Sequence, residues 1–445
     1  MIKILLLLFT LLGVSMGNNL PKYYTKTLEN GMQILVIPMQ NNSNVITTDI
    51  FYKVGSGDEI MGKSGIAHML EHLNFKSTEN LKAGEFDEIV KGFGGVNNAS
   101  TGFDYTQYFI KSSSKNLSKS LELFAELMQN LSLKDEEFQP ERDVVLEERR
   151  WRTDNNPFGY LYFRLFNNAY IYHSYHWTPI GFVEDIKHWT IDDIKSFHKM
   201  YYQPQNAILV VAGDIKPETV FEEAEKAFGS IKNDGKIRRN HQIEPVQDGA
   251  KRIEVDKESQ VEMLAIAFHI PNFQSPDQVA LSALSELLSS GKSSRLNALL
   301  VDKLQLVNSV SAYNMETKHP GIFLFLAVCN PGVKAEDVEK IIWDEIEKIK
   351  NKEVTQEELD KIKINTKSDF IFSMQDSQTL VNIFGGYAAK GDLEPLLQYE
   401  ERLMKLTPAQ IKEVAQKYFT HKNSTTLILR KLKDETKKQE TKEVK

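Results

Sequence analysis

The stretch WTIDDIKSFHKMYYQPQNAILVVAGDI, residues 189–215, recurs in altered form as LTPAQIKEVAQKYFTHKNSTTLILRK, residues 406–431. Each stretch predicts an N-capped amphipathic helix, then a turn, then a buried strand. Identical residues stand 217 positions apart throughout: Thr190 and Thr407, Ile194 and Ile411, Tyr201 and Tyr418, Asn206 and Asn423. Because one spacing holds across three elements, we infer that the chain contains one structural unit twice.

The repeat sets the expected domain organisation. The first unit runs from about residue 23 to residue 231 and the second from 251 to 432, and residues 232–250 have the polar, Gly- and Pro-containing composition of a linker. The charged run 433–445 predicts a solvated tail. Segments with strand spacing alternate with segments of helical spacing, so each unit is predicted to be α+β, a largely antiparallel mixed sheet with helices on one face.

Composition limits the class of protein. The chain has 445 residues, of which 41% are hydrophobic, enough for at least two packed domains. The net charge of −7 is spread without a dense Lys/Arg block, so we expect no nucleic-acid partner. The single cysteine, Cys329, excludes an internal disulfide and a Cys-based zinc site.

The N-terminus has the pattern of a secretory signal over residues 1–17. Lys3 precedes an apolar run that is shorter than the ~20 residues of a membrane-spanning helix, and small residues precede a cut after Gly17. We therefore expect an exported protein without a stable membrane anchor; a buried N-terminal helix or an uncleaved anchor is the alternative. An exported chain that lacks disulfides fits a bacterial periplasm.

The stretch HMLEH, residues 68–72, carries the chemistry. It lies in a segment, residues 65–76, whose apolar periodicity predicts a helix, so His68 and His72 share one face and can reach one metal ion. Glu71 lies on the same side, in the inverted order of the common zinc-protease motif. A surface helix with solvated histidines is the alternative interpretation.

A catalytic zinc site also needs a third protein ligand. The candidate source is the acidic stretch QPERDVVLEERRWRTDNNP, residues 139–157, in which Glu141 and Glu148 are two helical turns apart and project from one face. Spacing alone does not rank Glu141, Glu147 and Glu148.

The segments VGSGDEIMGKSGIAHMLEHLNFKST and ERDVVLEE resemble the pitrilysin family of inverzincin zinc metallopeptidases, in particular the branch that includes the β-subunit of the mitochondrial processing peptidase. Together with the repeat, this resemblance covers most of the chain. It implies one Zn²⁺ per chain, held by His68, His72 and Glu148, which follows His72 by 76 residues. It also implies that Glu141 is a supporting acid of the catalytic site.

The reaction that the resemblance implies is hydrolysis of peptides or unfolded polypeptides by an endopeptidase. Glu71 would act as general base, taking a proton from water and passing it to the leaving amine. The alternative is a non-catalytic peptide-binding or core structural subunit of a processing-peptidase-like complex, because the same fold occurs in metal-free subunits.

The segment GGVNNASTGFDYTQYFI, residues 94–110, alternates and is interpreted as a strand. In the resembling enzymes an extended peptide adds to the edge of this strand. The resemblance therefore implies substrate contacts at Asn98, Ala99, Ser100 and Thr101.

The second unit lacks the metal ligands. At the 217-residue spacing, His68, Glu71, His72 and Glu148 correspond to Ser285, Leu288, Ser289 and Asn365. In the resembling enzymes this unit supplies an Arg and a Tyr that contact the substrate, and the matching positions here are Val301 and Asn308. We therefore expect a homologous, zinc-free partner subunit that carries the Arg and Tyr; a homodimer is the alternative.

Overall fold

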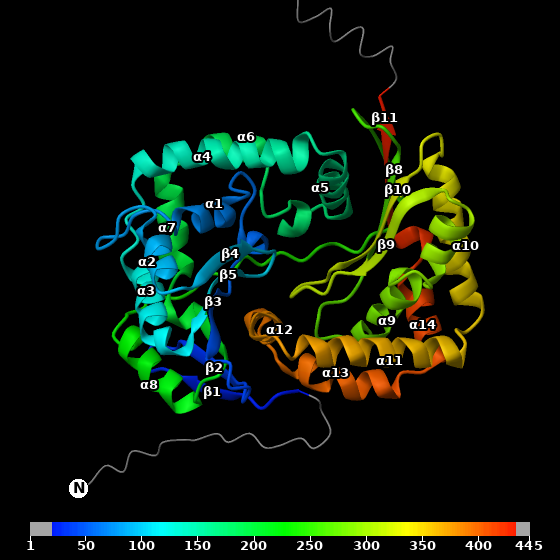
Figure 1. The fold of residues 1–445 in the computed structure, drawn as a ribbon. Helices are drawn as coiled ribbons and strands as arrows, with labels where there is room; N and C mark the ends of the chain where they lie inside the picture. Colours follow the sequence, from blue (N-terminus) through cyan, green and yellow to red (C-terminus); the bar gives the residue numbers. More distant parts are fainter. Residues whose placement is uncertain (1–19, 433–445) are drawn as a thin grey trace, which may run out of the picture.

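The computed structural model describes residues 20–432, so the predicted signal (1–17) and charged tail (433–445) lie outside the described residues. Two sheets, each backed by helices, lie side by side (Figure 1). The strands of the first sheet are β1 (Tyr24–Thr27), β2 (Gln33–Pro38), β3 (Val45–Tyr52), β4 (Val96–Thr101), β5 (Thr106–Ser113) and β6 (Ala207–Gly213). Those of the second sheet are β7 (Lys251–Lys257), β8 (Met263–His269), β9 (Val307–Asn314), β10 (Ile322–Cys329) and β11 (Ser424–Lys431).

The helices divide between the two halves of the chain. The first half has α1 (Ile66–Leu73), α2 (Glu85–Gly92), α3 (Leu117–Gln129), α4 (Asp135–Arg149), α5 (Pro157–Ala169), α6 (Val183–His188), α7 (Ile191–Tyr201) and α8 (Pro217–Phe228). The second half has α9 (Gln278–Ser289), α10 (Ala335–Asn351), α11 (Gln356–Ser373), α12 (Ser377–Lys390), α13 (Glu394–Lys405) and α14 (Pro408–Tyr418).

The strand order confirms the predicted α+β fold with two equivalent units. The first sheet has the order β1-β2-β6-β3-β5-β4 and the second the order β7-β11-β8-β10-β9. Each sheet has one parallel pair, β2 with β6 and β7 with β11, and the other pairs are antiparallel. Apart from β1, each strand of the first sheet therefore has a counterpart in the second.

The repeated stretch forms the same helix, turn and strand in both halves. Thr190 caps α7 and Thr407 caps α14, each by accepting a hydrogen bond from the backbone N–H three residues later. The turn is held by the side chain of Asn206, which donates to the carbonyl of Tyr201 at 2.8 Å, and Asn423 makes the equivalent bond at 2.9 Å. The side chains that recur in the sequence are thus the ones that begin the helix and close the turn.

Each sheet is covered on one face by helices of its own half. Alternate strand residues such as Ile46, Ile50 and Tyr52 pack with α1, α2, α3, α7 and α8 in one core. The corresponding face of the second sheet packs with α9, α10, α11 and α14. The period-two alternation of the strands accounts for this single-faced packing.

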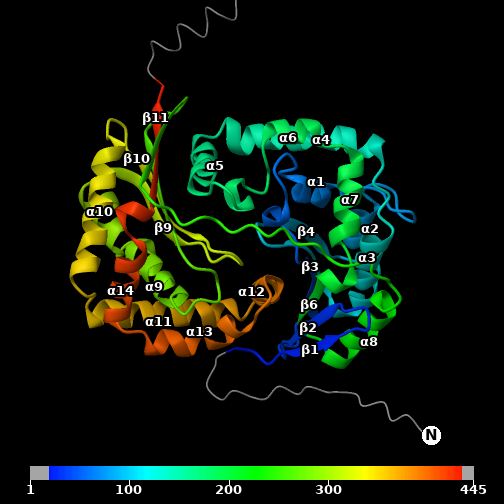
Figure 2. The same ribbon diagram turned by 180° about the vertical axis from the view of Figure 1, so that it is seen from behind.

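The opposite face of each sheet is covered by a helix from the other half (Figures 1 and 2). Leu380, Val381 and Phe384 of α12 pack on β2, β3 and β6 of the first sheet. Leu161 and Phe166 of α5 pack on β8, β10 and β11 of the second sheet. This reciprocal exchange buries β6 and β11 on both faces and braces the halves against each other.

One predicted strand is two strands. Residues 94–110 form most of a hairpin, in which β4 and β5 are joined by a turn closed by the Gly102 N–H donating to the Tyr105 carbonyl at 2.9 Å. The prediction of a single strand was wrong because Gly102 and Asp104 are turn residues that reverse the chain; Asp104 is buried and accepts hydrogen bonds from Tyr175 and from the Lys318 N–H. The hairpin places β4 at the edge of the first sheet.

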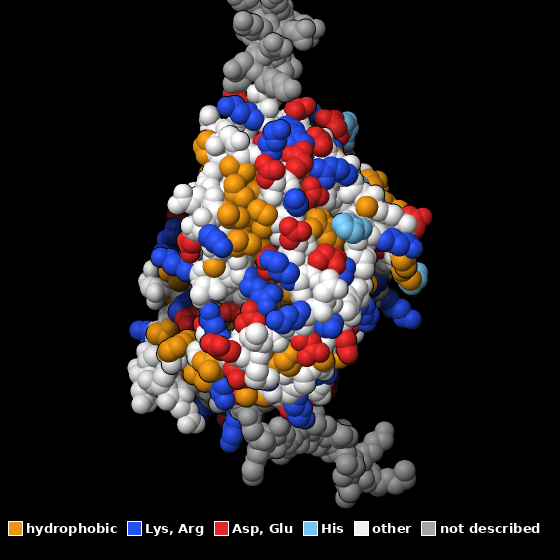
Figure 3. Space-filling view, turned by 90° about the vertical axis from the view of Figure 1, so that its right-hand side faces the viewer, with side chains coloured by type: hydrophobic (Ala, Val, Ile, Leu, Met, Phe, Trp, Pro, Cys, Tyr) orange, Lys and Arg blue, Asp and Glu red, His pale blue; other side chains and the backbone are white. Residues whose placement is uncertain are grey.

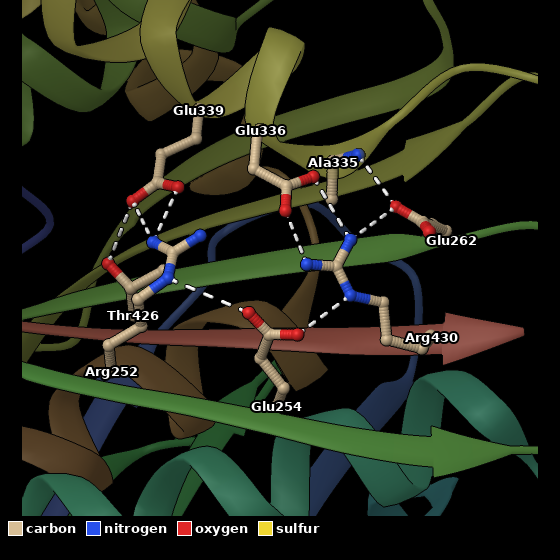
Figure 4. Close-up of polar contacts among 8 residues, drawn as sticks. All are labelled: Arg252, Glu254, Glu262, Ala335, Glu336, Glu339, Thr426 and Arg430. Carbon is tan, nitrogen blue, oxygen red and sulfur yellow. Dashed lines mark hydrogen bonds and ion pairs between the residues drawn. The ribbon is translucent and has the colours of Figure 1, made fainter.

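Charged side chains fasten the start of α10 to the second sheet (Figure 4). The guanidinium of Arg430 on β11 pairs with Glu336 of α10 and, at 3.0 Å, with Glu254 of β7. Arg252 of β7 pairs with Glu339 of α10 at 2.7 Å. Hydrogen bonds from Arg430 lower the pKa of Glu336 to about 2, so this carboxylate is ionised at all ordinary pH values.

The surface of the second half mixes both signs of charge. In the face turned toward the viewer in Figure 3, acidic and basic side chains are interspersed with apolar ones. Within residues 20–432, none of the helices combines the length and apolarity that a membrane crossing requires.

Candidate metal centre

The helix that carries HMLEH is anchored at its start by a buried carboxylate. The N-cap residue, Gly65, has φ 86° and no side chain with which to cap the helix. Glu59 takes over this role, accepting hydrogen bonds at 2.8 Å from the backbone N–H groups of Gly65 and Ala67 and at 2.7 Å from the Trp177 ring N–H. The apolar face of α1 is buried in the core, which turns His68 and His72 toward α4.

Three side chains from α1 and α4 face one point. Glu148 Oε2 lies 3.3 Å from His72 Nε2 and 3.7 Å from His68 Nε2. One ligand atom of each residue lies within 4.8 Å of the other two, and within residues 20–432 this is the one group of at least three such side chains that could hold a metal ion. Two imidazoles and one carboxylate are a donor set that suits Zn²⁺ and leaves a fourth position open.

The protonation of the two histidines differs. Burial lowers the pKa of His68 to about 4, so its imidazole is neutral. Burial alone would also lower the pKa of His72, but without a bound metal ion its hydrogen bonds to Glu141 and Glu148 raise it to about 9, so His72 has to lose a proton for its Nε2 to bind a metal ion. Both carboxylates keep their pKa below the ordinary value, because the interaction with His72 outweighs burial.

Glu141 lies behind His72 and outside the group of three ligand atoms. Its Oε1 is 2.8 Å from His72 Nδ1, and its Oε2 is 2.6 Å from Lys76 Nζ. A hydrogen bond at Nδ1 leaves Nε2 of His72 free to face Glu148 and a metal ion. This geometry suits the supporting role expected for Glu141.

Glu71 lies beside the three ligands and is oriented by the edge strand. Thr101 Oγ1 at the end of β4 donates to Glu71 Oε2 at 2.5 Å. Burial raises the pKa of Glu71, while this hydrogen bond opposes the increase. A carboxylate with a raised pKa is a better proton acceptor near neutral pH.

The four residues expected to contact substrate form one run of β4. Asn98 and Ser100 are exposed, and Ala99 and Thr101 are half-buried. The Asn98 side chain accepts a hydrogen bond from the Ala99 N–H at 2.9 Å. The side of β4 away from β5 has no neighbouring strand in the sheet, so backbone groups there can pair with a peptide.

In the second half, the serines that stand at the positions of His68 and His72 make hydrogen bonds to a neighbouring strand. Ser285 and Ser289 of α9 both donate to the Ala312 carbonyl of β9. The counterpart of α4 is α11, which starts at Gln356, 221 residues after Asp135, so the 217-residue spacing is not kept at this helix. At a spacing of 221 residues Glu148 corresponds to Asp369, but Ser285 and Ser289 still stand in place of both histidines, so among the described residues the second half holds no group of three candidate metal ligands.

The positions expected for the Arg and Tyr carry neither residue, and only Asn308 of the two has a side-chain donor. Val301 packs against the core of the second half, and Asn308 is exposed on β9. The nearby Arg295 forms a bidentate pair with Glu358: its Nε donates to Oε1 at 2.8 Å and its Nη2 donates to Oε2 at 2.9 Å. Tyr313 is exposed on β9, five residues beyond Asn308.

The fold and the site together define a zinc metallopeptidase built from an active and an inactive unit, and the chain belongs to the M16 peptidase family. Residues 35–171 match the family model described as "Insulinase (Peptidase family M16)", and residues 188–366 match "Peptidase M16 inactive domain". The family thus agrees with a group of candidate metal ligands in the first half and with the lack of such a group in the described part of the second.

Similar proteins cover nearly the whole chain. The zinc protease PqqE of Helicobacter pylori is 53% identical over 428 residues, which are 95% of this chain and 96% of that protein. The crystal structure of a protease from Helicobacter pylori has 53% identity and a TM-score of 0.91, covering 92% of this chain and all of that one. A probable mitochondrial-processing peptidase subunit beta of Arabidopsis thaliana is 24% identical, covering 91% of this chain and 77% of that protein.

Sequence reasoning missed Glu59 and Arg152, and it expected Thr101 to contact substrate rather than Glu71. Glu59 lies only six residues before Gly65, but the loop between them has no regular pattern that indicates the contact; the contact from Thr101 to Glu71 joins residues 30 apart on different elements. Arg152, which pairs with Glu148 Oε1 at 2.7 Å, could have been found, because it lies four residues after Glu148 on a predicted helix.

Proposed function

We propose that the chain is an endopeptidase that hydrolyses peptides or unfolded polypeptides, with one Zn²⁺ held by His68, His72 and Glu148. The observation that carries this proposal is the convergence of these side chains beside Glu71. A zinc ion bound there would acidify a water molecule and polarise the scissile carbonyl. Glu71 would accept the proton of that water and donate it to the leaving amine.

The chain's own residues prepare this step. Thr101 holds one oxygen of Glu71, and burial keeps the pKa of Glu71 raised, so the carboxylate can both take and release a proton. An extended peptide would pair with the open edge of β4 along Asn98, Ala99, Ser100 and Thr101. The contact from Thr101 to Glu71 links the peptide-binding strand to the base.

The test is Glu71→Gln, with Glu147→Gln as matched control, because Glu147 is an exposed glutamate of α4 that pairs with Arg150. We expect Glu71→Gln to keep zinc and to lose about 10²- to 10⁴-fold in the rate of cleavage of a quenched peptide. The control should match the wild type. A Glu71→Gln protein that still cleaves with zinc bound would contradict the assigned base.

We also propose that full activity needs a homologous partner subunit that supplies an Arg and a Tyr. This rests on Val301, which has no side-chain donor, on Asn308, which has neither the charge of an Arg nor the reach of a Tyr, and on Arg295, which is paired with Glu358. The loss of one donor to a transition-state oxyanion costs about 3 kcal/mol in hydrolases. Full activity of the purified chain as a monomer would refute the proposal of a partner subunit. Full activity as a dimer of this chain would support the homodimer alternative instead. Low activity that a co-purifying M16 homologue restores would support the proposed partner subunit.

We further propose that the chain is exported to a bacterial periplasm, on the pattern of residues 1–17. Fractionation of the native cells, with the N-terminus of the mature protein sequenced, tests this. A cytoplasmic protein that retains Met1 would overturn it.

A further inference from the structure

The two oxygens of the Glu148 carboxylate have different partners. Oε2 faces the imidazoles, at 3.3 Å from His72 Nε2 and 3.7 Å from His68 Nε2. Oε1 is paired with Arg152 Nη1 at 2.7 Å. The carboxylate is therefore held at both oxygens, and only one of them is directed at the metal position.

The backbone of Arg152 is placed by tertiary packing. After α4 the chain continues through one π-helical turn, Arg150–Asp154, before α5 begins. Gly159, in the first turn of α5, packs so closely on this turn that a Cβ there would overlap the carbonyl oxygen of Arg152. Such π turns in a helix often mark a functional position.

A buried arginine fixes the same turn from the other side. Arg149 donates to the Gly181 carbonyl, pairs with Asp154 at 3.3 Å, and lies 4.0 Å over the ring of Phe163. Its side chain is almost fully buried. The turn that carries Arg152 is thus anchored to α5 and to the loop before α6, so the backbone position of Arg152 does not depend on its own ion pair.

A neighbouring pair shows what an ordinary surface contact looks like. Arg150 pairs with Glu147 at 2.8 Å, and Arg150 and Arg152 are equally exposed, at 61% and 62%. The acidic partners differ: Glu147 is 70% exposed, but Glu148 is only 15% exposed and faces the histidines. An exposed surface pair contributes little to stability, so stability alone does not explain the Arg152 pair.

We propose that Arg152 is a positioning residue that holds Oε1 of Glu148 and so limits Glu148 to binding zinc through one oxygen. A free carboxylate can bind a metal ion through one or both oxygens. A second oxygen on zinc would compete for the position that a catalytic site keeps open for water. The inference rests on the proposed zinc site and concerns how the chain keeps that position available.

The test compares Arg152→Ala with the matched control Arg150→Ala, and uses Arg152→Lys as a conservative variant. Each protein is loaded with Co²⁺, whose visible absorption weakens as its coordination number rises. We expect weaker absorption from Arg152→Ala and a spectrum like the wild type from Arg150→Ala. Steady-state cleavage of a quenched peptide should show kcat reduced about 10- to 100-fold by Arg152→Ala with KM little changed, as for other residues that orient metal ligands.

The outcomes separate this proposal from the proposed function. Arg152→Lys keeps a cation that can reach Oε1, so it should recover part of kcat and of the Co²⁺ spectrum; circular dichroism and thermal unfolding confirm that each variant folds. A Co²⁺ spectrum of Arg152→Ala and Arg152→Lys identical to that of Arg150→Ala overturns the assignment. If the wild-type protein binds neither Zn²⁺ nor Co²⁺, the proposed function fails; if it binds Co²⁺ but is inactive by itself, as the proposed partner requirement predicts, the Co²⁺ spectra still decide the role of Arg152.

Discussion

Removal of the Glu141 carboxylate should weaken zinc binding without removing a ligand. Glu141 Oε1 accepts the hydrogen bond at His72 Nδ1 at 2.8 Å, and its side chain is only 11% exposed, so water cannot easily replace it. A hydrogen bond between charged groups contributes about 1.5–3 kcal/mol. Partners that orient metal ligands typically account for 10- to 100-fold in metal affinity, about 1.4–2.7 kcal/mol. The two estimates agree.

The size of the effect should depend on the replacement. In Glu141→Gln the amide oxygen can still accept the proton at His72 Nδ1, so we expect a loss near tenfold. In Glu141→Ala no acceptor remains and Lys76 loses its partner, which leaves an unpaired cation near the metal site. That variant should approach a hundredfold loss.

The measurement is a zinc titration of the metal-free protein in competition with a chromophoric chelator. Glu147→Ala is the control, because Glu147 lies on the same helix but is 70% exposed and contacts Arg150. A zinc affinity of Glu141→Ala within about twofold of that of Glu147→Ala would refute the reasoning.

Three further outcomes follow from other contacts. Thr101→Val removes the hydrogen bond that lowers the pKa of Glu71, so the acidic limb of the pH profile of kcat/KM should move up by roughly one pH unit; an unchanged profile would contradict the assigned base. Glu336→Gln should cost under about 1 kcal/mol in urea unfolding at pH 6, because the side chain is partly exposed. Since the Arg430 pair lowers the folded-state pKa of Glu336 to about 2, below its usual 4.5, this difference should be lost as the pH falls from 4.5 to 2; a difference that persists at pH 2 would argue against the pair. Gly385→Ala places a Cβ against the ring of Phe51 on β3, which lies under α12, and should destabilise the protein by about 1–3 kcal/mol, measured by urea unfolding. An unchanged free energy of unfolding would show that α12 packs less tightly than described.

The site could be predicted largely from sequence because its parts are short-range patterns. His68, Glu71 and His72 lie within about one helical turn, so helical geometry alone places them together. Glu141 and Glu148 share one face of α4 for the same reason. The choice of Glu148 over Glu147 came from the family resemblance, since spacing treats them alike. The structure separates them: Glu148 faces the histidines and Glu147 faces solvent.

The repeat predicted the fold class but not how the halves hold together. Period-two and helical patterns show which face of an element is apolar, but they do not say which partner covers it. The exchange of α5 and α12 between the sheets is therefore visible only in the structure. The turn between β4 and β5 was missed because the alternation of residues 94–110 was followed across the turn residues Gly102 and Asp104; the burial of Asp104 against the loop that contains Lys318 is visible only in the structure.

The sequence by itself indicated His68, His72 and Glu71 as candidate site residues and showed the presence of two equivalent units, because residues within a few helical turns of each other are positioned by local geometry. Only the tertiary structure decided that α4 crosses α1 so that Glu148 meets His68 and His72, that Thr101 reaches Glu71, and that Arg152 holds the second oxygen of Glu148. Those contacts join segments whose separation depends on how sheets and helices pack, and packing is a property of the whole folded chain.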